Sequence, residues 1–201
     1  MSLVFVPEKH LYILDGNELP SVTEICRFLN YDVAAGAKPW LRDAAADQGT
    51  RVHEWCMLHD YGDLSEADVE ADALGYVKAY IAFCRDYGPE WELIEHPMAC
   101  AAVGYGGTLD RLGMIDGKRS LLDIKTTSVL RKVPLAAQLA GYDTLLMNDP
   151  ERKWRVESFY GLHLKKDGCY DLVSIAPDYE SFDVCLMLHN KLKRKKRGSR
   201  E

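Results

Sequence analysis

The feature that most constrains this chain is a pair of apolar segments joined by a tight turn, within Gly106–Thr127. The dipeptide Asp116-Gly117 at the centre is typical of a two-residue type I′ β-hairpin. Such a turn fixes the register of the two strands, and stepping outward from it places Asp110 opposite Asp123. The stretch therefore predicts an antiparallel hairpin in which two carboxylates face each other across the ladder.

Two directly opposed carboxylates destabilise a sheet. At roughly 5 Å and an effective dielectric constant of about 20, their repulsion is about 3 kcal/mol. Lys125 follows Asp123 at a spacing of two, hence on the same face, but it supplies only one positive charge. A divalent cation compensates the pair better, and oxygen ligands favour Mg²⁺ or Mn²⁺. The alternative is a solvent-facing hairpin in which Asp123 and Lys125 form an ordinary ion pair, although the apolar residues around them argue against it.

Hydrophobic periodicity and turn signals organise the rest of the chain. The expected elements are, in order, a hairpin over 3–14, a turn over 15–20, helices over 21–29, 40–58 and 66–88, strands over 91–103, 107–115 and 120–127, a helix over 134–146, strands over 153–164 and 168–175, and a helix from 177. Ser21 and Glu24 form a capping box at the start of the first helix. This order predicts an α/β fold with a central mixed β-sheet flanked by helices and a helical N-terminal elaboration.

The length of 201 residues suits one domain, with an N-terminal hairpin and helix in 1–39, a core in 40–176 and a C-terminal helix with a basic tail in 177–201. No apolar run approaches the length of a membrane span, and the first residues do not form a signal peptide, so we expect a cytoplasmic protein. The six cysteines include no C-x-x-C pair, and we expect reduced thiols.

Charge is distributed unevenly. Residues 191–201 hold seven of the 25 Lys and Arg residues and one of the 31 Asp and Glu residues, which leaves the first 190 residues with 18 basic and 30 acidic side chains, a net charge of −12. A basic tail on an acidic body suits contact with nucleic acid or another polyanion. Taken alone, such a run is more often a solvated helix end.

Four motifs occur in a defined order. Gly107–Arg111 reads G-T-L-D-R, and Leu121–Thr126 reads L-L-D-I-K-T; Gly49–His53 contains G-T-x-x-H on a predicted helix, and Gln138 and Tyr142 form Q-x-x-x-Y on the helix after the lysine strand. Together they resemble the PD-(D/E)XK nuclease superfamily, most closely its RecB-type and phage lambda-exonuclease-type branch. The resemblance covers about residues 40 to 165 and implies a restriction-endonuclease-like core.

The resemblance implies a metal-dependent DNA exonuclease that leaves 5′-phosphates, acting in phage or prophage recombination or repair. It implies that Asp110, Asp123, the carbonyl of Ile124 and His53 hold Mg²⁺, with Mn²⁺ as a substitute. In that mechanism Lys125 orients the attacking water or stabilises the charge that develops on the phosphate. An endonuclease, or a catalytically inactive nucleic-acid-binding module of the same fold, is the alternative.

The remaining assignments are more local. In the family, the pair formed by Gln138 and Tyr142 positions substrate near the catalytic centre; without the family, it is a hydrogen-bonded pair on one helix face. Gly49 lies one helical turn before the histidine and is expected to allow close approach of another element. Glu95 is expected as an accessory group in the strand before the hairpin.

Partners and cofactors follow from the same resemblance. Arg131 and Lys132 are expected to contact the backbone of the DNA strand being cut. DNA and a single-strand annealing or recombination protein are the expected partners. Only Cys169 and Cys185 lie near the C-terminus, which argues against the iron–sulfur cluster that some family members carry.

Overall fold

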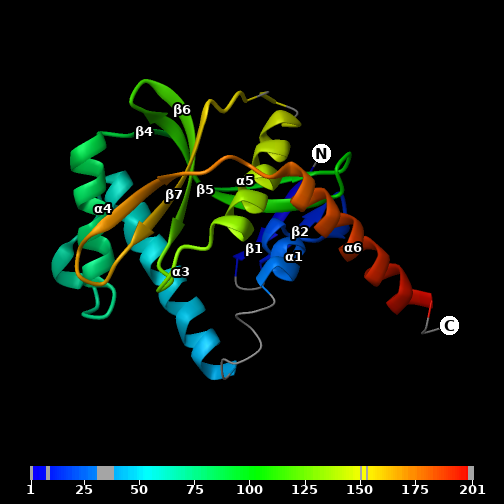
Figure 1. Cartoon of the computed structure of the whole chain (residues 1–201), viewed down its shortest axis with the longest axis horizontal. Helices are drawn as coiled ribbons and strands as arrows, with labels where there is room; N and C mark the ends of the chain where they lie inside the picture. The colour runs from blue at the N-terminus through cyan, green and yellow to red at the C-terminus, as the bar shows by residue number, and fades with distance from the viewer. Residues whose placement is uncertain (1, 8–9, 31–38, 150, 153, 199–201) are drawn as a thin grey trace.

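A five-stranded mixed sheet forms the centre of the protein. The structure is a computed structural model, which describes residues 2–7, 10–30, 39–149, 151–152 and 154–198. The sheet has the order β4-β5-β6-β7-β8 (Figure 1). Its strands are β4 (Glu90–Cys100), β5 (Tyr105–Ile115), β6 (Lys118–Lys125), β7 (Ser158–Leu164) and β8 (Tyr170–Ser174). All neighbours are antiparallel except β6 and β7, which run parallel because α5 connects them as a crossover.

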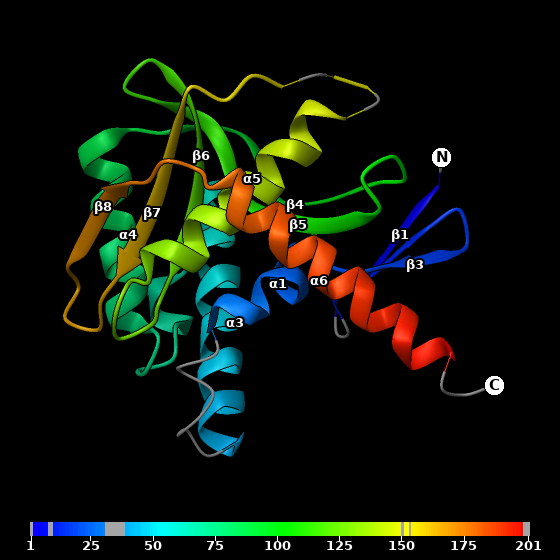
Figure 2. The same ribbon diagram turned by 45° about the vertical axis from the view of Figure 1, so that its right-hand side comes forward.

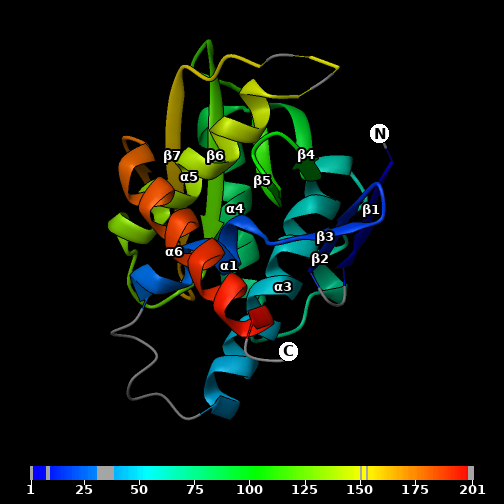
Figure 3. The same ribbon diagram turned by 90° about the vertical axis from the view of Figure 1, so that its right-hand side faces the viewer.

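Helices cover both faces of this sheet. The helices α3 (Pro39–Tyr61) and α4 (Leu74–Tyr87) enclose one hydrophobic cluster, in which Tyr80 and Phe83 join Leu122 and Leu162. On the other face α5 (Lys132–Met147) packs on β5 and β6, while α1 (Val22–Cys26) and α6 (Tyr179–Gly198) pack on α5 (Figure 3). The predicted α/β class, with a mixed sheet flanked by helices, is confirmed.

The central hairpin has the predicted register. Ile115 pairs with Lys118, and the ladder continues outward to Arg111 and Leu122. The turn residues Asp116-Gly117 both have positive φ, 48° and 74°, as a type I′ turn requires. The paired positions end at Arg111 and Leu122, immediately before the two aspartates.

The N-terminal part contains one strand more than expected. A small sheet has the order β1-β2-β3, with β1 (Leu3–Val6), β2 (Leu11–Leu14) and β3 (Asn17–Leu19). The prediction of a plain turn over 15–20 is wrong, because two residues with positive φ complete the reversal and the next three pair back with β2. The capping box is confirmed at its first bond, since the N–H of Glu24 donates to Ser21 Oγ at 3.0 Å. The α-helix ends at Cys26, and a 3₁₀ turn, η2 (Arg27–Asn30), follows.

Other boundaries shift slightly. The predicted helix over 66–88 is divided into a 3₁₀ turn, η3 (Glu66–Asp68), and α4, which ends at Gly88 with φ 50°. Helix α5 begins two residues before Pro134, which its first turn accommodates because N–H groups there need no intrahelical partner. Helix α6 projects away from the sheet (Figure 2). Most side chains of the basic tail, from 194 onward, lie outside the described residues. Among the helices that the structure describes, none is long and apolar enough to span a membrane.

Candidate metal centre and active site

His53 is the point where four elements of the fold meet. It lies on α3, and its Nδ1 is 3.1 Å from Oε1 of Glu95 on β4 and 3.7 Å from Oδ1 of Asp110 on β5. Its Nε2 is 3.2 Å from the carbonyl oxygen of Ile124 on β6. Packing of α3 against this face of the sheet therefore brings together a histidine and two carboxylates that are distant in sequence.

Asp110 is held where the hairpin ladder ends. Its Oδ2 accepts a hydrogen bond from the N–H of Ile124 at 2.6 Å, which replaces the next ladder bond. The side chain is nearly buried. Burial raises the pKa of Asp110 to about 7; the nearby carboxylates of Asp123 and Glu95 add to this effect, while His53 opposes it. The predicted repulsion between the two aspartates is thus present, alongside the larger effect of burial.

Three side chains that can bind a metal ion come together here. Donor atoms of His53, Glu95 and Asp110 all lie within 4.8 Å of one another. Burial acts to lower the pKa of His53, but the charges of Asp110 and Glu95 outweigh it and raise this pKa to about 9. This raised pKa favours the protonated imidazole beside the two carboxylates, whose charges a bound cation would also satisfy. The two carboxylates supply the kind of oxygen ligand that Mg²⁺ and Mn²⁺ take.

Glu95, expected only as an accessory group, is a full member of this cluster. It has φ 43°, an uncommon conformation for a residue other than glycine. Its neighbours in β4 keep their pairing with β5, since Ile94 pairs with Arg111 and His96 with Leu109. Such strain costs roughly 1–3 kcal/mol and tends to occur at functional sites. The sequence carried one signal for it, an acidic residue in the strand that precedes the hairpin.

Arg111 and Asp60 were missed by sequence reasoning. Arg111 is fully buried in β5, and its Nε donates to Oδ2 of Asp60 at 2.6 Å. Its Nη1 donates to Oε1 of Glu95 at 2.8 Å and to the carbonyl of Asp110 at 2.7 Å. The guanidinium thus fixes the carboxylate that contacts His53. An arginine directly after the aspartate, inside an apolar strand, was the available signal.

Asp123 and Lys125 form a pair beside the cluster. Lys125 Nζ is 2.6 Å from Oδ2 of Asp123, as expected for residues on one face. Burial acts to lower the pKa of Lys125, but Asp123 and Asp110 outweigh it and raise this pKa. Asp123 is 3% exposed, so the alternative of a solvent-facing hairpin is wrong. The side chain of Ile124 is buried on the opposite face, among Leu122 and Leu162.

Gln138 and Tyr142 lie one turn apart on α5 and are both buried. Gln138 Nε2 is 3.5 Å from Oγ1 of Thr23, a residue of α1. Burial, with the charges of Asp123 and Asp110, raises the pKa of Tyr142, whose ring lies over Gly107. Tyr142 therefore borders the two aspartates from the α5 side, while the printed contact of Gln138 is with α1.

Two further expectations concern neighbouring positions. A Cβ at Gly49 would lie 3.6 Å from Thr126 Oγ1, an ordinary contact, so the expected close approach of another element is wrong. Arg131, half-buried, is the residue before α5, and Lys132, exposed, is the first residue of that helix.

Comparisons with known proteins give structural matches. No protein-family model matches the chain, and no curated protein matches its sequence. The structure is similar to an alkaline exonuclease from Laribacter hongkongensis, LHK-Exo, at 15% identity and a TM-score of 0.39, over 89% of this chain and 92% of that one. It is also similar to the protein SSO0001, at 15% identity and a TM-score of 0.37, over 70% of this chain and 68% of that one.

Proposed function

We propose that this protein is a metal-dependent nuclease that hydrolyses phosphodiester bonds of DNA, with an exonuclease as the favoured type. One observation carries the proposal: His53, Glu95 and Asp110 converge at the end of the β5–β6 ladder, with the charged Lys125 in the adjoining position. Of the three, Asp110 is buried and the other two are half-buried, and two carboxylates gathered in this way call for a compensating positive charge.

His53, Glu95 and Asp110 would hold Mg²⁺ or Mn²⁺, with the carbonyl of Ile124 and the carboxylate of Asp123 as adjoining oxygen ligands. Such a cation, when bound, would make a water molecule more acidic and polarise the scissile phosphate. Arg111 keeps Glu95 aimed at His53, and the N–H of Ile124 keeps Asp110 in place. These contacts orient the ligands before a cation binds, which is the usual role of groups that hydrogen-bond to metal ligands.

Lys125 would act on the reacting phosphate as a positive charge. Its raised pKa keeps it protonated, which makes it a poor general base. Held by Asp123, its ammonium group can stabilise the negative charge that develops during attack and orient the water molecule. Gln138 and Tyr142 would then fix the substrate on the α5 side, with 5′-phosphate ends as the product.

Several features of the chain support DNA as the substrate. An acidic body of net charge −12 needs locally concentrated basic residues to bind a polyanion. The tail over 191–201, with Arg131 and Lys132 beside the lysine strand, would provide them. A role in phage or prophage recombination or repair, with an annealing or recombination protein as partner, belongs to the same proposal.

The test is cleavage of end-labelled linear duplex, linear single-stranded and circular DNA, each with Mg²⁺ and with EDTA. Mg²⁺-dependent loss of linear DNA, with circular DNA intact, supports an exonuclease. Cleavage of circular DNA indicates an endonuclease. Retention of all substrates with Mg²⁺ or Mn²⁺, together with DNA binding, would identify an inactive binding module and overturn the proposal.

A further inference from the structure

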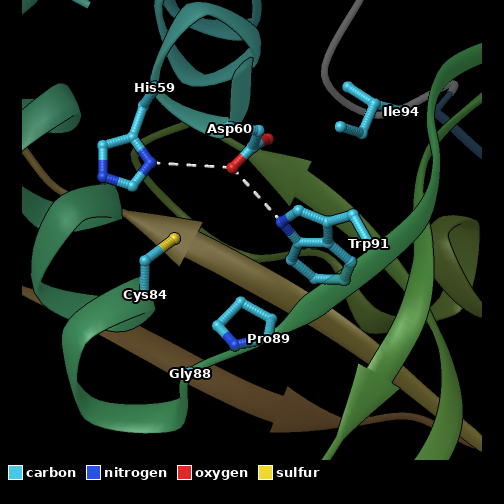
Figure 4. Close-up of a pocket in the computed structure, with 7 residues that line it drawn as sticks. All are labelled: His59, Asp60, Cys84, Gly88, Pro89, Trp91 and Ile94. Atoms are coloured by element: carbon cyan, nitrogen blue, oxygen red, sulfur yellow. Dashed lines mark hydrogen bonds and ion pairs between the residues drawn. The ribbon is translucent and has the colours of Figure 1, made fainter. Parts of the chain in front are cut away.

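A second group of metal-binding side chains lies away from the lysine strand, where α3 and α4 end. His59 and Asp60 are in the last turn of α3, and Cys84 is in the last turn of α4. Donor atoms of the three lie within 4.8 Å of one another. They border a cavity of about 250 Å³ whose other walls are Gly88, Pro89, Trp91 and Ile94 (Figure 4).

In the described part of the chain, His59 presents an unpartnered ring nitrogen to this group of side chains. Its Nδ1 is buried, has no hydrogen-bond partner among the described residues, and lies 3.6 Å from Oδ1 of Asp60. Ligand atoms of a tetrahedral zinc ion, with bonds of 2.0–2.3 Å, are roughly 3.5 Å apart. Figure 4 shows the sulfur of Cys84 pointing toward the space between the imidazole and the carboxylate. The ring of Tyr80 meets the imidazole edge to face and helps to orient it.

Asp60 has bonding capacity left for a cation. Its Oδ2 accepts from Arg111, and its Oδ1 accepts from Trp91 Nε1 at 3.2 Å. The hydroxyl of Tyr80 lies 2.9 Å from Oδ1 and 2.8 Å from Oδ2, and its single proton serves one of them at a time. Arg111 does not repel a cation strongly, because its charge is also paired with Glu95.

We propose that His59 Nδ1, Cys84 Sγ and Asp60 Oδ1 form a zinc-binding site whose fourth position opens into the cavity. A mixed nitrogen, sulfur and oxygen set selects a borderline ion such as Zn²⁺ and disfavours Mg²⁺, which takes oxygen ligands. Three protein ligands with one open position match the coordination number of zinc. The site is separate from the His53 cluster in its donors and in its preferred metal.

Zinc at this site would join the ends of α3 and α4. Burial, together with the charge of Asp60, raises the pKa of the Cys84 thiol to about 12, so the metal-free thiol is protonated and zinc binding releases that proton to solvent. Because the ion binds only the folded arrangement of the two helices, it would raise thermal stability in proportion to its occupancy. Arg111 forms ion pairs with both Asp60 and Glu95, so it links this site to the His53 cluster.

The experiment uses Co²⁺ as a spectroscopic substitute for zinc, with excess Mg²⁺ present to occupy the oxygen-rich cluster. Wild type should show the ultraviolet charge-transfer band of a thiolate–cobalt bond and the visible bands of tetrahedral cobalt, and one equivalent of Zn²⁺ should remove both. Cys84→Ser and His59→Asn should each weaken Zn²⁺ affinity more than roughly a hundredfold. Such a loss exceeds the one typical of residues that only hydrogen-bond to a metal ligand. Cys169→Ser changes an exposed cysteine and is the matched control.

Circular dichroism of each variant establishes that it is folded. Absence of the thiolate band in wild type, or its persistence in Cys84→Ser, overturns the proposal. A band lost equally in Cys169→Ser would assign the metal to the exposed cysteine and would also overturn it. The readout is metal binding, so it stands whether or not the protein cleaves DNA.

Discussion

The carboxylate of Asp110 accepts a hydrogen bond from the N–H of Ile124 across 2.6 Å, just beyond the last paired position of the hairpin. This hydrogen bond is accepted by Oδ2, while Oδ1 lies 3.7 Å from Nδ1 of His53. The hairpin therefore holds its own buried acid in place, and the ionised acid is costly until a cation or a proton compensates it.

Asp110→Asn should abolish Mg²⁺-dependent cleavage while the fold survives. Asparagine still accepts the Ile124 hydrogen bond through its side-chain oxygen, but it removes the carboxylate whose pKa burial, with the nearby Asp123 and Glu95, raises to about 7. The metal-free variant should thus be at least as stable as the metal-free wild type at pH 8, and Mg²⁺ should no longer raise its melting temperature. Asp116→Asn, at an exposed turn position of the same hairpin, is the control. A metal-free variant that melts clearly lower than wild type would contradict the account of paired carboxylates.

Lys125→Ala should slow the chemical step by roughly a hundredfold to a thousandfold, the usual loss for one electrostatic contact in a transition state. Metal binding and DNA binding should change little, because an ammonium group cannot ligate the cation. Lys125→Arg should restore only part of the rate, since a planar guanidinium replaces a compact charge. Single-turnover cleavage of a labelled linear duplex measures the step, with the exposed Lys118→Ala as control. Equal rates for wild type and Lys125→Ala would refute the assigned role.

The stability of the metal-free protein should fall as pH rises from about 6 to 9. The pKa of His53 is raised to about 9 in the fold, so its contribution is complete below its usual value of 6.5 and is lost as pH rises through 9. The pKa of Asp110 is raised to about 7, so the folded state also loses this proton within the same range. Both groups act in one direction, because the folded state binds more protons than the unfolded state. Melting temperatures in EDTA across this pH range measure the effect.

Mg²⁺ should offset part of this fall in stability, because His53 and Asp110 must lose the same protons before they can bind the cation. The increase in melting temperature caused by Mg²⁺ should be larger at pH 9 than at pH 6. His53→Gln should flatten the pH dependence measured in EDTA. A melting temperature in EDTA that rises between pH 6 and 9 would show that other groups dominate the linkage.

Arg111→Met should destabilise the protein by about 3–5 kcal/mol, the typical cost of removing one partner of a buried ion pair. The substitution leaves Asp60 buried without its 2.6 Å partner and releases Glu95 from the guanidinium. Arg119→Met removes a partly exposed ion pair with Glu92 and should cost at most about 1 kcal/mol. Urea denaturation of the two variants compares the sites directly, and equal losses would show that the buried pair contributes no more than the surface pair.

Local features of the sequence were enough to predict the central hairpin. Asp116-Gly117 demands two successive residues with positive φ, which fixes the turn type, and the turn then fixes the register for the whole ladder. The same local logic predicted that Lys125 and Asp123 share a face, because side chains alternate along a strand. The helix end at Gly88 and the bond from Glu24 to Ser21 also follow from a few adjacent residues.

The composition of the candidate site was decided by tertiary structure. The sequence placed Glu95 near the hairpin, but its bond to Arg111 requires the pairing of β4 with β5, and its contact with His53 arises only when α3 packs on the sheet. Arg111 meets Asp60 across 51 positions of chain for the same reason. Turn geometry and strand alternation act between neighbours and can be recognised in a short segment. The burial of an acid beside a histidine or an arginine depends on how distant elements pack, and that is set by the whole hydrophobic core rather than by any single motif.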